Sequence, residues 1–132
     1  MTSVESLVVG DLHIEASLAE QPPSVRLAWT GKSNARQADQ LLLPYLERVL
    51  DQAAASGRSL ELRFEGLSHF NSSTIASVIQ LIQHAETRPA RLVIVFDPRR
   101  QWQRLSFDAL KVFVRPGGRF ELRTIDVGGE AM

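Results

Sequence analysis

The sequence predicts an α/β fold in which a mixed β-sheet of about five strands carries helices mainly on one face. Alternating apolar and polar residues recur along the chain, stretches with helical spacing separate the later strands, and two strand-like segments precede the first helix. The predicted order is β-β-α-β-α-β-α-β, which requires parallel strands joined by right-handed crossovers after an initial hairpin. Because 132 residues suit one hydrophobic core, we expect residues 1–132 to form a single domain.

Two strands are predicted before the first helix. Residues 7–17 are rich in branched side chains and are interrupted by Gly10 and Asp11, and residues 25–30 alternate in the same way. The consecutive prolines in 19–24 cannot donate hydrogen bonds to a sheet, so the chain turns there. These segments together predict a hairpin.

The first helix is predicted over 38–55, where apolar residues recur at helical spacing and Gly57 follows as a stop signal. Pro44 lies within this span. It either occupies the first turn of a helix that begins near Leu43 or kinks a longer helix. Residues 59–67 then alternate between apolar and charged side chains, which predicts a half-buried strand.

The second half of the chain predicts two further helices and two further strands. A helical stripe runs through 69–86, and the apolar run 91–96 is typical of a strand covered on both faces. The stripe consists of Ile75, Ile79 with Val78, Ile82 and Ala85. A third amphipathic helix is expected within 97–114, and 119–127 closes the chain as a strand. The apolar stripe of the third helix is predicted to consist of Trp102, Leu105, Ala109, Val112 and Phe113.

Composition excludes several classes of site. Fifteen basic residues balance fifteen acidic ones, so no global field attracts nucleic acid or an anionic membrane. The chain has no cysteine, and its three histidines lack metal-ligand spacing, so we expect neither a metal nor another cofactor. No apolar run is long enough for a membrane span and the N-terminus lacks a basic signal region, which favours the cytoplasm.

The polar run from Asn71 to Thr74 at the start of the second helix is the strongest candidate for a site. Side-chain oxygens at a helix start accept hydrogen bonds from unpaired amides, and Asn71 or Ser72 can fill that role. Four polar residues exceed what one cap requires. If Asn71 caps the helix, the Ser72 hydroxyl can protrude into solvent, where a phosphate would meet the positive end of the helix dipole. Ser72 is therefore either part of a cap or a phosphorylation site.

A strand that runs directly into "NSSTIASVIQLIQHA" resembles the STAS domain of bacterial anti-sigma factor antagonists, over roughly residues 7 to 124. The resemblance places Ser72 at the phosphoacceptor, with Ser73 as the reserve candidate, and Gly31 at a glycine after the second strand. Asn71 stands where the family has an acid, and Thr74 where it has a glycine. "HFNSST" is also similar to the Phe-Asn-Thr-Ser-Ser motif of the divergent SiaC-type phosphoproteins, whose phosphoacceptor likewise follows the asparagine.

The resemblance implies a signalling regulator without catalysis of its own. Its partners would be proteins: a serine/threonine kinase or anti-sigma factor that binds the unmodified form, and a phosphatase that removes the phosphate. The rival implication is a constitutive STAS scaffold, for example a subunit of a transport ATPase, that uses the same surface without phosphorylation. The expected partner surface consists of Gly31, Lys32, Ser33, Asn34, Asn71, Ser72, Ser73, Thr74, Arg99 and Arg100.

Two other functions compete with this interpretation. A hydrolase would pair Ser72 or Ser73 with a histidine and an acid, but the glycine-flanked nucleophile turn is absent from the sequence. The sequence also lacks the glycine pattern that cradles a phosphate and the lysine that accompanies it, which argues against nucleotide binding. The candidate partners of the serine in a hydrolase are His69, His84, Glu65 and Asp97.

The segment 97–104 has two interpretations of its own. Its arginines beside Trp102 form either a docking patch for an acidic partner, or an exposed fringe around a tryptophan that is buried against the core. In both cases the segment is expected to flank the surface around Ser72.

Overall fold

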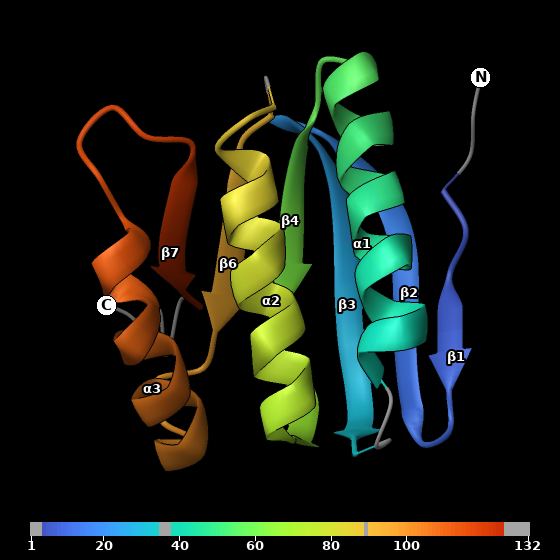
Figure 1. Ribbon diagram of the computed structural model, residues 1–132, viewed down its shortest axis with the longest axis vertical. Helices are drawn as coiled ribbons and strands as arrows, with labels where there is room; N and C mark the ends of the chain where they lie inside the picture. The colour runs from blue at the N-terminus through green and yellow to red at the C-terminus, as the bar shows by residue number, and fades with distance from the viewer. Residues whose placement is uncertain (1–3, 35–37, 89, 126–132) are drawn as a thin grey trace.

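The computed structural model describes residues 4–34, 38–88 and 90–125. One β-sheet carries α1, α2 and α3 on the same face (Figure 1). The elements in chain order are β1 (Leu7–Val9), β2 (Leu12–Glu20), β3 (Pro23–Ser33), α1 (Ala38–Ala55), β4 (Ser59–Arg63), β5 (Leu67–Phe70), α2 (Ser72–Ala85), β6 (Leu92–Phe96), α3 (Gln101–Asp108), the 3-10 helix η1 (Ala109–Phe113) and β7 (Phe120–Thr124).

The strand order confirms the predicted mixed α/β class. The sheet runs β1-β2-β3-β4-β6-β7, with β5 paired to the far end of β3. Strand β2 is antiparallel to both of its neighbours, β1 and β3, whereas β3, β4, β6 and β7 are parallel. The hairpin and the parallel crossovers were both expected from the order of the elements.

The sheet has seven strands because two predicted strands are each divided. A turn at Gly10, whose φ is +58°, separates β1 from β2. A second turn, closed by a 2.9 Å hydrogen bond from the Leu67 amide to the Phe64 carbonyl, separates β4 from β5. This turn lets β5 pair with the end of β3 beyond the reach of β4. Positions 126 and 127 of the predicted last strand lie outside the described residues.

Helix α1 resolves the two alternatives for Pro44. The helix runs without a break from Ala38 to Ala55, so Pro44 lies inside it and beyond its first turn. Gly57 follows the helix with a φ of +70°, the left-handed conformation that glycine adopts without steric cost.

The predicted apolar stripe of the third helix was wrong in its orientation. Leu105 is 61% exposed and Val112 is 72% exposed, and Ala109 is also exposed. The sheet is contacted instead by Phe107, whose ring centroid lies 4.9 Å from that of Phe64, 5.5 Å from that of Phe70 and 5.3 Å from that of Phe96. The residues of α3 and η1 that are fully buried are Gln103, Phe107 and Leu110.

Burying the aromatic ring explains this rotation. A fully buried phenylalanine removes more apolar surface from water than a leucine or a valine does, and Phe107 lies on nearly the opposite side of the helix from Leu105. The helix can bury only one of these sides. The predicted stripe therefore keeps Trp102 and Phe113 at its half-buried ends and exposes its centre.

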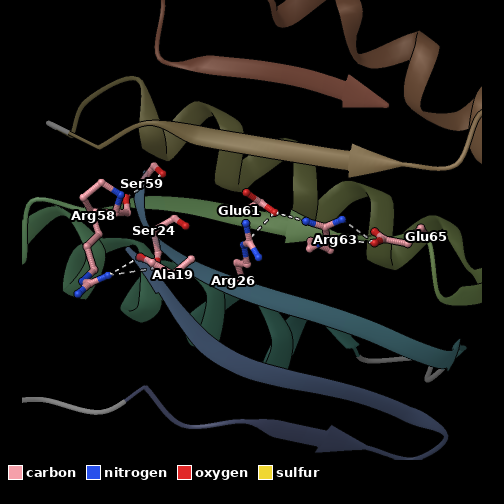
Figure 2. Close-up of polar contacts among 9 residues, drawn as sticks. Ala19, Ser24, Arg26, Arg58, Ser59, Glu61, Arg63 and Glu65 are labelled. Atoms are coloured by element: carbon pink, nitrogen blue, oxygen red, sulfur yellow. Dashed lines mark hydrogen bonds and ion pairs between the residues drawn. The ribbon is translucent and has the colours of Figure 1, made fainter. Parts of the chain in front are cut away.

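The face of the sheet without helices is lined by paired charges (Figure 2). The carboxylate of Glu61, on the central strand β4, lies 3.4 Å from the guanidinium group of Arg26 on β3 and 2.7 Å from that of Arg63. The guanidinium group of Arg63 also lies 2.8 Å from the carboxylate of Glu65. On β6, Val93 and Val95 point to this face and are each 3% exposed, so the predicted burial of the strand on both faces is confirmed. The Arg26–Glu61 pair joins β3 to β4, and the two Arg63 pairs lie along β4 and the turn that follows it.

Candidate functional site

The predicted site residues gather at one edge of the sheet. The C-terminal end of β3 and the first turns of α2 and α3 all lie at the lower edge in Figure 1. Strand β5 links them, because it pairs with the end of β3 and is followed by a single residue, Asn71, before α2 begins. Polar groups at this edge are thus held by three elements that share one core.

Asn71 is the N-cap of α2. Its backbone is extended, and its side-chain Oδ1 accepts hydrogen bonds from the Thr74 amide at 3.0 Å and from the Thr74 hydroxyl at 2.8 Å. The backbone amide of Asn71 donates a 2.9 Å hydrogen bond to the backbone carbonyl of Ser33. The cap therefore satisfies one of the unpaired amides of the helix start and anchors that start to β3.

Ser33 and Thr74 form a buried hydroxyl pair behind the cap. Their oxygens lie 2.6 Å apart, and the two residues are 2% and 0% exposed. Because the single hydroxyl proton of Thr74 is directed at Asn71, Ser33 donates to Thr74. Thr74, which stands where the STAS pattern has glycine, is thereby part of the support of the helix start.

Ser72 and Ser73 differ in their exposure. Ser72 is exposed in the first turn of α2, whereas Ser73 is half-buried. The Ser73 carbonyl accepts a 3.2 Å hydrogen bond from the Ser77 hydroxyl. Since Asn71 performs the capping, the side chain of Ser72 is not needed for it. A phosphate on Ser72 would extend into solvent beside the positive end of the helix dipole.

The predicted residues of β3 lie directly beside this helix start. Lys32 pairs in register with His69 and Ser33 pairs with Phe70, and Lys32 and Asn34 are exposed. Gly31 has a φ of +84°, and a Cβ at this position would collide with the Asp11 carbonyl of the neighbouring turn. Gly31 is thus required by the backbone, whereas Lys32 and Asn34 present side chains at the surface.

The segment 97–104 reaches the same edge through Trp102. The Trp102 ring is half-buried, and its centroid lies 5.1 Å from that of Phe70 and 6.3 Å from that of His69. Arg99 and Arg100 are exposed, so the structure favours the interpretation in which Trp102 packs on the core side and the arginines face water.

Asp97 holds the two arginines in place. The Nε and Nη2 atoms of Arg99 each lie 3.1 Å from the Asp97 carboxylate, and the backbone amide of Arg99 donates to the same carboxylate at 2.9 Å. The Nε atom of Arg100 lies 4.0 Å from this carboxylate. The hydrogen bonds from Arg99 hold the pKa of the Asp97 carboxyl below its usual range. Asp97 is therefore a charged anchor of this loop at neutral pH.

Gln103 was not identified from the sequence. Its buried side-chain amide donates to the carbonyls of Phe64 at 2.7 Å and Leu67 at 3.1 Å, and its oxygen accepts from the Asp97 amide at 2.8 Å. It therefore fixes the start of α3 to the turn that precedes β5. A glutamine among arginines gives no sequence signal of this role, because its partners are backbone groups.

The candidate partners of a hydrolase serine other than His69 are engaged elsewhere. His84 lies at the far end of α2 from Ser72, about 18 Å along the helix at 1.5 Å per residue, and contacts Glu47 and Asp51 of α1 at 3.7 and 3.6 Å. Glu65 and Asp97 are each paired with an arginine.

No three His, Asp or Glu side chains within the described ranges are grouped to hold a metal ion. None of the described helices combines the length and apolar character needed to cross a membrane.

Comparison with known proteins identifies the fold. No family model matches the chain, and neither does any curated protein sequence. One chain of the crystal structure of the diguanylate cyclase SiaD in complex with its activator SiaC from Pseudomonas aeruginosa is similar, with a TM-score of 0.57 at 20% identity, over 91% of this chain and 98% of that one. A DUF3478-family protein with a SpoIIAA-like fold from Shewanella loihica has a TM-score of 0.52 at 14% identity, over 92% of this chain and 90% of that one. The chain has a STAS-like, SpoIIAA-like fold.

Proposed function

We propose that this chain is a cytoplasmic, non-catalytic regulator that binds a partner protein with the surface around the start of α2, under the control of reversible phosphorylation of Ser72. The observation that carries the proposal is that the residues of the polar run Asn71 to Thr74 have different roles. Asn71 and Thr74 support the helix start, while Ser72 is exposed and takes no part in the cap. A phosphate at Ser72 changes the surface without removing a group on which the fold depends.

The size of the charge change supports a switch. A phosphoserine carries about −1.5 to −2 charges at neutral pH, and the first-turn amides of a helix stabilise such a group. A partner that packs against the small Ser72 hydroxyl would instead meet a solvated dianion. Lys32, Asn34 and the exposed arginines of the 97–102 loop complete the surface that the partner contacts.

The similar solved structures suggest the class of partner. One of them contains a diguanylate cyclase with its activator. We infer that this chain binds an effector enzyme of signalling, with a diguanylate cyclase as the first candidate. A serine/threonine kinase or anti-sigma factor and a phosphatase would set the modification state.

The test compares four forms of the chain recovered from the cells in which it occurs naturally. These are the wild type, Ser72→Ala, Ser72→Asp and the matched control Ser73→Ala. Intact-mass measurement and peptide mapping should place one phosphate on the wild type and on Ser73→Ala, and none on Ser72→Ala.

Binding of the recovered partner is then measured with purified proteins. We expect Ser72→Ala to bind like the unmodified wild type and Ser72→Asp to bind at least about tenfold more weakly, which corresponds to about 1.4 kcal/mol. Equal affinities of the two variants would support the constitutive scaffold. A phosphate located on Ser73 would instead identify Ser73 as the regulatory residue.

A further inference from the structure

Positive charge is concentrated in one segment of a chain whose net charge is zero. Residues 99–119, which cover α3, η1 and the loop after them, contain six cations and one acid, and all six cations are exposed. The cations of this segment are Arg99, Arg100, Arg104, Lys111, Arg115 and Arg119.

Only part of this charge is balanced by nearby acids. Lys111 lies 3.5 Å from Asp108, Arg115 lies 4.0 Å from Glu86, and Asp97 faces Arg99 and Arg100. Within the part of the chain that the structure describes, no carboxylate lies within ion-pair distance of Arg104 or Arg119. The surface of this segment therefore keeps an excess of positive charge.

The same segment exposes an apolar strip. Leu105 and Ala109 are four residues apart, and Val112 follows three residues later in the 3-10 turn, so all three project from one side. Leu105 and Val112 are 61% and 72% exposed, and Val114 just beyond is 42% exposed. Leu105 on α3 and Ala109 and Val112 on η1, with the flanking Arg104 and Lys111, form one surface, which we call the outer face of α3.

An apolar strip flanked by cations is complementary to an amphipathic helix with acidic flanks, but it also resembles a membrane-surface helix. The aromatic residues decide between these occupants. Helices that lie on a bilayer direct large aromatic and apolar residues into it, whereas here Phe107 is fully buried and Trp102 and Phe113 pack against the core. The exposed strip consists only of leucine, alanine and valine, which suit the close packing of one helix on another.

We propose that the outer face of α3 is a docking surface for an acidic amphipathic helix of a partner protein. This inference goes beyond the function of Ser72, because the outer face lies on another helix and requires no phosphate. The first turn of α3 lies at the same edge of the sheet as Ser72, so one partner can contact both surfaces (Figure 1).

The test uses the full chain labelled with ¹⁵N and a synthetic helical peptide that has leucines at i, i+3, i+4 and i+7 and glutamates on its flanks. The controls are a peptide of the same composition in scrambled order, a version with lysine in place of glutamate, and vesicles of phosphatidylcholine and phosphatidylglycerol in equal amounts. Amide chemical shifts locate the binding surface, and their concentration dependence gives the dissociation constant.

The acidic peptide should bind with a dissociation constant below about 1 mM and should shift amides within 101–115. The double variant Leu105→Ser/Val112→Ser should weaken binding at least about tenfold, and Arg104→Glu/Lys111→Glu should do the same through charge. Val8→Ser is the matched control, because Val8 is 63% exposed on β1 at the opposite edge of the sheet, and it should leave the affinity unchanged.

Three outcomes would overturn the proposal: no shifts with the acidic peptide, shifts located elsewhere, or equal binding of the scrambled peptide. Shifts of the same amides by vesicles alone would assign the outer face to a lipid surface. None of these outcomes involves Ser72, so this experiment leaves the function proposed for Ser72 to its own test.

Discussion

Asn71 shows how much a single residue contributes to the site. The polar run predicted both a cap and an exposed hydroxyl, but the sequence could not assign the two roles. The assignment depends on Ser33, which lies 41 positions before Thr74 and fixes the Thr74 hydroxyl from behind. Side-chain partners so distant in sequence leave no local pattern, so the exposure of Ser72 and the burial of Thr74 required the structure.

Replacing the cap should destabilise the protein measurably. Asn71→Ala removes the acceptor for the Thr74 amide and hydroxyl, and we expect the free energy of unfolding in urea to fall by about 1 kcal/mol. Asn71→Asp keeps the acceptor and adds a negative charge at the helix start, so it should be as stable as the wild type or more stable by about 0.3–1 kcal/mol. Wild-type stability of Asn71→Ala would show that the cap is dispensable.

Tyr45 gives a residue-scale prediction on pH. Burial raises its pKa to about 12, and its hydroxyl donates a 2.6 Å hydrogen bond to the Glu5 carbonyl. Because the folded-state pKa lies above the unfolded value of about 10, the stability that the neutral phenol contributes is complete below pH 10 and is lost as the pH rises toward 12.

The measurement of Tyr45 is unambiguous because it is the only tyrosine in the chain. The ultraviolet absorbance of the phenolate should appear near pH 12 in the folded protein and near pH 10 in urea. Tyr45→Phe serves as the control that lacks this signal. A midpoint near 10 without denaturant would contradict the buried position of the hydroxyl.

At the scale of elements, hydrophobic periodicity predicted which segments are helices but not always which side they bury. In α2 the stripe was nearly right, since Ile82 and Ala85 are fully buried and Ile75 and Ile79 are half-buried. In α3 and η1 the predicted side faces solvent. The rotation of a helix is set by the side chains that the strands beneath it present, here the rings of Phe64, Phe70 and Phe96.

The rotation of α3 can be tested by comparing two truncations. Phe107→Ala removes a fully buried ring and should lower the free energy of unfolding by about 3–5 kcal/mol. Leu105→Ala, on the exposed side, should change it by no more than about 0.5 kcal/mol. Chemical denaturation of both variants measures the difference, and the opposite order of stabilities would restore the predicted stripe.

For the whole molecule, the alternation of strands and helices was sufficient to predict the mixed sheet with its helices on one face. It was not sufficient to predict that β5 pairs with β3 instead of extending β4. That pairing depends on the turn between β4 and β5 and on a shift of register between Gly31 and Lys32. It is also what brings the predicted residues of β3 to the start of α2.

The layout of the sheet predicts a gradient of local stability. Strands β4 and β6 have paired neighbours on both sides and almost entirely buried side chains, whereas β1 is three residues long and lies at an edge. Native-state hydrogen exchange should therefore be slowest in β4 and β6 and fastest in β1. Equal protection of β1 and β4 would indicate that the hairpin unfolds only together with the centre of the sheet.

The buried hydroxyl pair of Ser33 and Thr74 also has a mechanical consequence. It ties the last residue of β3 to the first turn of α2, and β3 is the strand that pairs with β2, β4 and β5. The helix start cannot shift without stretching this bond and pulling on that strand. The exposed Ser72 is therefore carried by a helix start that is hydrogen-bonded to an interior strand of the sheet.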